Sequence, residues 1–110
     1  MQINLTARHI RASKVLKDHA ISKISKLEKF YEGIVWCDVI LTAEKTPKNS
    51  NKVEVIMRVY RSTLSSTARS DEFMTAVGEA VDKIERQIKK YKSKLRERHK
   101  IQKRRTMLAA

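Results

Sequence analysis

The feature that most constrains the fold is a long run of apolar residues at helical spacing in the second half of the chain. From Phe73 to Leu95 these residues recur at steps of three or four, which keeps them on one face of a helix. Gly78 inside the run costs about 1 kcal/mol relative to alanine, so we expect a close contact with a helix or the sheet there. Cap and acidic residues mark the start of the helix: Ser70, Asp71 and Glu72.

Two elements are predicted before Gly33. Residues 1–7 alternate apolar and polar side chains, which is typical of a strand with one buried face. From Ser13, which can cap the first turn, the spacing becomes helical and predicts a helix over residues 14–32, with Gly33 as its stop. The solvent flank of this helix carries two lysines, Lys26 and Lys29.

Three further strands are predicted between the two helices. Residues 34–42 are almost continuously apolar and rich in β-branched types, and residues 44–51 have loop composition. Residues 53–60 alternate as a third strand, and residues 63–69 give a weaker fourth strand after a short connection at Arg61 and Ser62. The second strand is expected to have both faces at least partly covered, with one set of residues on one face, Val35, Cys37, Val39 and Leu41, and another set on the other, Trp36 and Ile40.

The predicted order of elements is therefore βαβββα. A helix between the first two strands makes them a parallel pair if they are neighbours, and the next strands form an antiparallel meander. We expect an α+β fold, a four-stranded mixed sheet with two helices packed on one face. The length of 110 residues suits one domain over residues 1–98, followed by a short, basic and flexible C-terminal tail, residues 99–110.

The net charge of +13 is distributed very unevenly. Residues 1–82 carry 13 Lys and Arg against 10 Asp and Glu, a net +3, whereas residues 83–110 carry 12 against 2, a net +10. Such a one-sided field attracts polyanions. The implied partner is RNA, DNA or an anionic membrane surface.

The best candidate surface is a basic flank of the second helix. A charge run on a helix is most often only a solvated face, but here just Glu85 and Glu97 oppose it after position 83. The spacing of three and four residues projects several cations from one side of a rigid rod, a pattern suited to successive phosphates. The residues of this flank are Lys83, Arg86, Lys90 and Lys94.

Other basic residues could enlarge that surface. Lys26 and Lys29 would extend it if the two helices pack side by side and leave a basic channel between or beside them. Arg8, after the first strand, would add to one end. Taken singly, each of these residues is also what an ordinary protein surface contains.

Several function classes are disfavoured. The apolar face of the second helix is already claimed by the core, and no apolar run approaches the about 20 residues of a bilayer span, so we expect a cytoplasmic protein that does not bind membranes. His9, His19 and His99 lack companions at ligand spacing, and no catalytic grouping is present. We therefore expect no metal, cofactor or small-molecule substrate and no enzymatic activity. Cys37 is expected to be a buried, reduced thiol.

The second helix contains a distinctive stretch, Val81-Asp82-Lys83-Ile84-Glu85-Arg86-Gln87-Ile88 followed by Lys89-Lys90-Tyr91-Lys92-Ser93-Lys94-Leu95. These residues resemble those of the ribosome hibernation promoting factor and ribosome-associated inhibitor A family. The likeness covers residues 1–98 and includes the opening strand and the end of the first helix. At the places where the family usually has a Met-Tyr pair and an acidic or amide residue, this chain has Phe73-Met74 and Gly78.

The resemblance implies a bacterial factor of stress and stationary phase, in a short form without the second domain of long members. It implies binding to the small ribosomal subunit, in the channel used by mRNA and by A-site and P-site tRNAs. Contacts with small-subunit rRNA, and with small-subunit proteins if these border the site, would block translation and preserve idle ribosomes. The resemblance assigns rRNA binding to the basic positions of this motif, which in this chain are Lys83, Arg86, Lys90 and Lys94.

Two alternatives stay open. The first is a general RNA-binding protein or RNA chaperone that acts off the ribosome, for which a sheet with two helices on one face is also a suitable platform. The second is a regulator that binds a protein, or a second copy of itself, through the exposed sheet face. The residues of that face are Trp36, Ile40, Ile56 and Tyr60.

Overall fold

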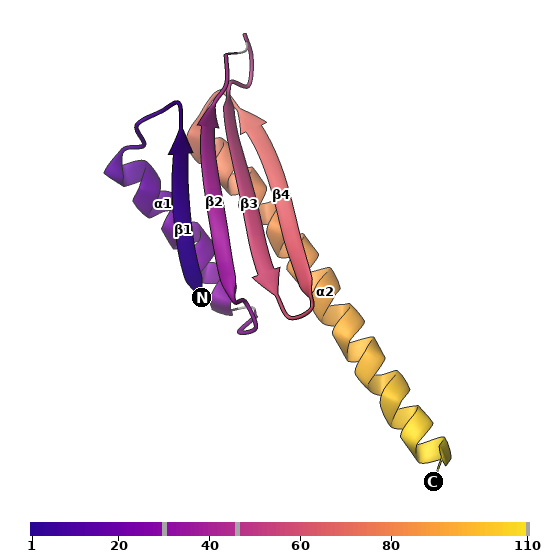
Figure 1. Cartoon of the computed structure of the whole chain (residues 1–110). Coiled ribbons are helices and arrows are strands. Elements are labelled where there is room, and N and C mark those ends of the chain that lie inside the picture. Colours follow the sequence, from indigo (N-terminus) through magenta and orange to yellow (C-terminus); the bar gives the residue numbers. More distant parts are fainter. Residues whose placement is uncertain (30, 46, 110) are drawn as a thin grey trace.

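The computed structural model describes residues 1–29, 31–45 and 47–109, with side chains as far as Glu97. Its elements follow the order βαβββα and confirm the predicted α+β class (Figure 1). The elements are β1 (Gln2–Arg8), α1 (Lys14–Ser25) continued by the 3-10 turn η1 (Lys26–Lys29), β2 (Trp36–Ala43), β3 (Asn51–Val59), β4 (Ser62–Ser70) and α2 (Phe73–Ala109).

The four strands form one mixed sheet in the order β1-β2-β3-β4. β1 pairs with β2 in parallel, and the pairs β2–β3 and β3–β4 are antiparallel. Both helices cover the same face, α1 beside β1 and α2 across β3 and β4 (Figure 1). β4 is therefore one edge of the sheet, and it lies beside α2.

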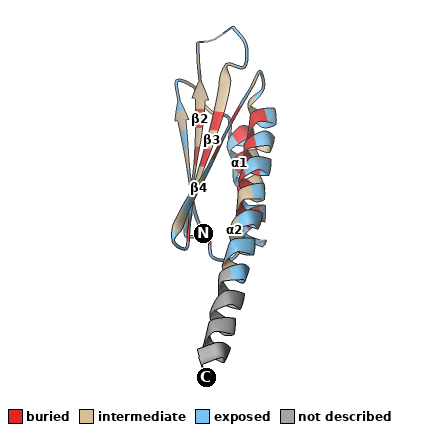
Figure 2. Ribbon diagram, turned by 90° about the vertical axis from the view of Figure 1, so that its right-hand side faces the viewer, coloured by how far each residue is buried: buried red, intermediate tan, exposed pale blue. Residues whose placement is uncertain are grey.

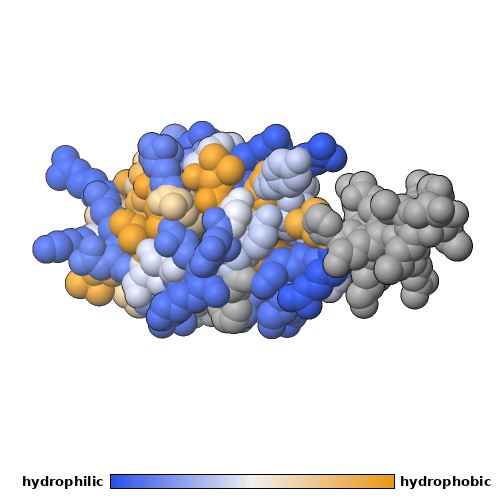
Figure 3. Space-filling view, turned by 90° about the horizontal axis from the view of Figure 1, so that it is seen from below, coloured by the Kyte–Doolittle hydropathy of each residue, from blue (hydrophilic) through white to orange (hydrophobic). Residues whose placement is uncertain are grey.

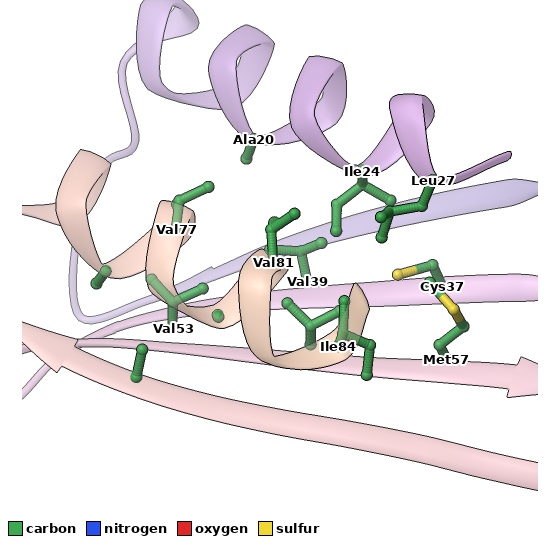
Figure 4. Packing of buried hydrophobic residues seen from close by; sticks show 14 of the residues in the cluster. Ala20, Ile24, Leu27, Cys37, Val39, Val53, Met57, Val77, Val81 and Ile84 are labelled. Atoms are coloured by element: carbon green, nitrogen blue, oxygen red, sulfur yellow. The ribbon is translucent and has the colours of Figure 1, made fainter. Parts of the chain in front are cut away.

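The core fills the single layer between the sheet and the helices (Figure 2). Alternate residues of β2 and β3 face it, and α2 contributes a row at helical spacing. Figure 4 shows Val77 and Val81 of α2 close to Ala20 and Ile24 of α1, so this side of α2 faces α1. Burying a side chain such as Ile84, which is 0% exposed, stabilises the fold by about 1.5–3 kcal/mol.

The first helix is shorter than predicted. Its N-cap is confirmed, since the Ser13 hydroxyl accepts the N–H of Leu16 at 3.1 Å, but regular α-helix ends at Ser25. η1 then tightens the winding, which keeps Leu27 buried while the chain turns toward β2. Gly33 does not end the helix, because it lies beyond η1 and its φ is not positive.

The predicted position of Val35 is wrong. Its side chain is 59% exposed, because pairing as a strand begins only at Trp36 and Ile34 occupies the core instead. The other residues predicted to share this face are covered: Cys37, Val39 and Leu41 are at most 1% exposed.

Gly78 makes no close contact, contrary to prediction. A Cβ built at this position would meet nothing within 4 Å. The space around the helix at Gly78 is therefore open, and the glycine is not required by packing.

The connection between β3 and β4 consists of Tyr60 and Arg61 rather than Arg61 and Ser62. Ser62 already pairs with Val59 and belongs to β4, which confirms the weakly predicted fourth strand. Arg61 has φ +60°, a left-handed conformation that glycine or asparagine adopts more easily than arginine.

The start of α2 lies next to the predicted loop between β2 and β3. Ser70 Oγ accepts the N–H of Glu72 at 3.4 Å, whereas the Asp71 carboxylate accepts the N–H of Asn49 at 2.8 Å. The Asn51 amide also donates to the Asp71 carbonyl at 2.8 Å. Asp71 therefore holds the β2–β3 loop rather than the first helical turn.

Candidate nucleic-acid interface

The basic flank of α2, Lys83, Arg86, Lys90 and Lys94, is exposed along its whole length. At 3.6 residues per turn, Lys83, Lys90 and Lys94 fall within about 40° of one another around the helix axis, and Arg86 lies about 60° further from the core. Because the opposite side of α2 is packed into the core, the helix cannot rotate these cations away. The structure thus fixes them in a row.

The basic flank lies next to the edge of β4. The Lys83 ammonium donates to the carbonyl of Thr67 at 2.8 Å, and the Gln87 amide donates to the carbonyl of Ser65 at 2.5 Å. One turn further along, the Tyr91 hydroxyl donates to the carbonyl of Tyr60. These three bonds attach α2 to the edge strand and to the β3–β4 turn.

The cations of the flank differ in how available they are. Lys83 is held by Thr67, whereas Arg86, Lys90 and Lys94 form no hydrogen bond or ion pair with any other residue whose side chain the structure describes. Lys89, outside the flank, is paired with Glu85 at 3.6 Å. Three unpaired cations therefore remain for an external anion.

Lys26 and Lys29 lie on the other side of α2. They are exposed in η1 next to α1, while the basic flank faces the β4 edge, so a channel between the helices does not contain both groups. The part of the flank around Lys90 and Lys94 is nevertheless near the same end of the sheet as these lysines, since Tyr31 and Tyr91 pack edge to face with 5.6 Å between ring centroids. Glu28 beside these lysines pairs with the N-terminal ammonium of Met1 at 3.2 Å.

Arg8 lies apart from the α2 flank. It ends β1 on the sheet face that carries no helix, and it shares a cross-strand row with Thr42, Lys52 and Arg69. In this row Lys52 and Arg69 are paired with Glu44, at 3.8 and 3.4 Å. An RNA-binding role of Arg8 stays a prediction that requires a second contact surface.

The end of the sheet where α2 leaves it carries many hydrophilic side chains (Figure 3). Blue side chains surround separate apolar patches in this view. Among the side chains near this end, Tyr60 is 58% exposed and the guanidinium carbon of Arg61 lies 5.1 Å from its ring centroid. Sequence reasoning missed this pair as a basic feature, because nothing in the local pattern indicates that the turn approaches α2.

The sheet face opposite the helices carries both apolar and polar side chains and is partly exposed to solvent. Trp36, Ile40 and Ile56 are only partly exposed, and polar pairs flank them, such as Asn4 with Asp38 at 3.1 Å. Tyr60, which was assigned to this face from the sequence, lies in the β3–β4 turn.

The single cysteine of the chain lies in the core. Cys37 is a free thiol and 0% exposed, which confirms the predicted buried cysteine, and burial, together with the charge of Asp38, raises its pKa to about 12. Within the described part of the chain, no cluster of His, Cys, Asp and Glu could hold a metal ion, and no helix is long and apolar enough to cross a membrane.

A family model described as "Sigma 54 modulation protein / S30EA ribosomal protein" matches residues 3–96. The chain belongs to this family. The match includes both helices as far as Arg96, and so it includes the whole basic flank of α2. The final residues of the chain lie outside the match. Helix α2 continues through them to Ala109, and the flexibility expected of this tail stays a prediction.

Relatives from several bacteria support the same assignment. The chain is 30% identical to a protein named ribosome hibernation promoting factor from Azotobacter vinelandii, over 93% of this chain and 92% of the relative. It is 27% identical to the factor of that name from Escherichia coli K12, over 88% and 99% of the two chains. The Bacillus subtilis relative, named ribosome hibernation promotion factor, is 31% identical but only 54% of its length is covered.

Solved structures show the same fold. A ribosomal subunit interface protein from Coxiella burnetii superposes with a TM-score of 0.77 at 25% identity, covering 84% of this chain and 99% of that one. The N-terminal domain of Protein Y from Thermus thermophilus gives a TM-score of 0.72 at 21% identity, covering 83% and 99%.

Proposed function

We propose that this protein is a ribosome hibernation factor that binds the small ribosomal subunit through rRNA. It occupies the channel used by mRNA and by A-site and P-site tRNAs, blocks translation and preserves inactive ribosomes under stress. It acts by binding, without enzymatic chemistry. The observation that carries the proposal is the row of unpaired cations on α2 in a chain whose family and relatives have ribosomal names.

The physical argument begins with the phosphate backbone. Each cation that neutralises a phosphate releases condensed counterions, so a row of three or four gives substantial, salt-sensitive affinity. A rigid row also selects the geometry of the backbone it meets, which a flexible tail does not. The narrow body of the protein, with principal extents of 63 × 25 × 16 Å, suits entry into a channel that normally holds nucleic acid.

The test uses the three cations that have no structural bond. Arg86, Lys90 and Lys94 are changed together to glutamate, while Lys83 is kept because it is attached to Thr67. We expect the variant to stay folded and to be lost from ribosomes in co-sedimentation. The matched control changes three exposed lysines outside the flank to glutamate, Lys14, Lys17 and Lys45, and should still co-sediment.

Two further measurements locate the binding. Deacylated tRNA and a short mRNA should compete with the protein for small subunits, and translation of a reporter in a purified system should fall as the protein is added. Unchanged co-sedimentation of the triple variant would remove the assignment. Equal affinity for free duplex RNA and for small subunits at one salt concentration would favour the off-ribosome RNA chaperone instead.

A further inference from the structure

The turn between β3 and β4 presents an aromatic ring and a cation together at its tip. Tyr60 is 58% exposed, and the Arg61 guanidinium carbon lies 5.1 Å from the centre of its ring, within the range of a cation–π contact. The two side chains therefore form one surface that is both flat and positively charged.

The backbone at this tip is conformationally unfavourable for the residue that occupies it. Arg61 has φ +60°, and glycine or asparagine is the usual residue at such a position in a two-residue hairpin loop. An unfavourable backbone conformation kept in an exposed turn suggests that the side chain of that residue has a function. Among described residues Arg61 has no carboxylate partner, so this use is not an internal ion pair.

The tip is held in place against α2. The Tyr91 hydroxyl donates to the Tyr60 carbonyl, and the Tyr91 ring packs against Tyr31 at 74° between planes. Arg58, beside the turn, is likewise fixed by a bond to the Thr63 hydroxyl at 3.1 Å. A surface fixed in this way loses little conformational entropy when it binds a ligand.

The tip also continues the row of contacts along α2. Lys83, Gln87 and Tyr91 follow the β4 edge toward the turn, and Lys90 and Lys94 lie one turn apart on the same flank. An RNA backbone that runs along these lysines would pass the tip. At that point Tyr60 offers a stacking face, and Arg61 and Arg58 offer positive charge.

We propose that Tyr60 and Arg61 form a clamp for one unpaired nucleotide of the RNA bound along α2. Because Arg61 lies over one face of the Tyr60 ring, the base stacks on the other face, and the Arg61 guanidinium contacts the phosphate of that nucleotide. Stacking on an aromatic ring tolerates any base, because every base has a π face. The clamp rests on the proposed RNA-binding function and adds to it a preference for unpaired over fully paired RNA.

The test compares two RNA duplexes of equal length, one fully paired and one with a single bulged 2-aminopurine. Stacking on Tyr60 should quench the fluorescence of the bulged base, and the protein should bind the bulged duplex about tenfold more tightly, the scale expected for one stacked base. Tyr60→Ala should abolish both effects, whereas Tyr60→Phe, which keeps the ring, should retain them. The bond from Tyr91 uses the backbone of Tyr60 and survives both changes.

Arg61 is tested by Arg61→Gly and Arg61→Lys. The glycine relieves the φ strain and should fold at least as well as the parent chain, yet bind the bulged duplex less tightly. Lysine keeps the charge and should bind between the two. Equal affinity of the parent for both duplexes, no binding to either, or full preference in Tyr60→Ala would overturn the clamp.

The two proposals can fail separately. If the parent chain does not bind ribosomes but prefers the bulged duplex, the hibernation role is excluded and the clamp is retained. A parent chain that co-sediments with ribosomes, loses them in the Arg86, Lys90 and Lys94 variant, and shows no preference between the duplexes would remove only the clamp.

Discussion

The Lys83 ammonium donates to the carbonyl of Thr67 at 2.8 Å, so this lysine is attached to the edge of the sheet. Gln87 does the same for Ser65. An edge strand with free carbonyls is a template for pairing with another chain, and covering it suppresses that pairing.

Removing the two side chains that bond to the β4 edge should promote self-association. Lys83→Ala with Gln87→Ala is expected to lower the free energy of unfolding by only about 1–2 kcal/mol, at roughly 1 kcal/mol for each bond. Sedimentation velocity should nevertheless show concentration-dependent dimers or larger species. The control, Lys90→Ala with Ser93→Ala, makes the same charge change without touching β4 and should stay in the state of the parent chain. Identical sedimentation of both variants would argue against the edge-cover role.

Gly78→Ala should stabilise the protein. A Cβ meets nothing within 4 Å there, so the variant gains helix propensity, about 1 kcal/mol, without a steric cost. Gly33→Ala is the contrasting variant, because its Cβ would lie 2.5 Å from the Tyr31 ring and push that ring away from Tyr91. Urea unfolding should give shifts of opposite sign, and a loss of stability in Gly78→Ala would contradict the open space seen at the helix.

Stability should decline at alkaline pH partly through Cys37. Burial raises the folded-state pKa of this thiol to about 12 from its ordinary value of 9.0, so between these values the unfolded chain loses a proton that the folded chain keeps. The contribution is fully present below about pH 9 and is lost as pH rises toward 12. Unfolding free energies of the parent and Cys37→Ala should therefore converge over this range, since lysine and tyrosine titration is common to both. A constant difference would show that the thiol does not ionise on unfolding.

The salt dependence of RNA binding should show which cations of the flank contact a phosphate. Changing Arg86, Lys90 or Lys94 singly to glutamine should reduce the slope of log affinity against log salt by about one each if each contacts a phosphate. Fluorescence anisotropy with a labelled RNA measures this slope directly. Lys14→Gln and Lys17→Gln should leave it unchanged, and equal effects at all five positions would indicate a diffuse charge effect instead of defined contacts.

The fold was predictable because its local patterns are strong and consistent. Alternation in β3 placed Val53, Val55 and Met57 in the core, and the period of α2 placed Ile84 and Ile88 there. Errors occurred where tertiary contacts override local pattern. The end of the first helix tightens at η1, which keeps Leu27 buried. Gly78 is a different error, because a glycine in a helix does not by itself show whether a neighbour lies beside it, and here the space is open.

The candidate site was predictable only in part. Helical spacing placed Lys83, Lys90 and Lys94 on one flank, but it did not reveal what that flank lies against. The bond from Lys83 to Thr67 depends on the strand order, and the contact of the Tyr60–Arg61 turn with α2 depends on the register in which β3 pairs with β4. Contacts between segments that are distant in sequence leave no recognisable pattern in either segment alone.

The parallel pairing of β1 with β2 has a consequence for how the protein folds and opens. Asn4 bonds to Asp38 across 34 residues, whereas the β2–β3 and β3–β4 pairs and α2 are close neighbours in sequence. Contacts over short loops form early and those over long loops form late, so β1 and α1 should dock last and exchange their amide hydrogens first. The basic flank and the Tyr60–Arg61 turn belong to the early-forming half, which leaves the proposed RNA surface intact during such openings.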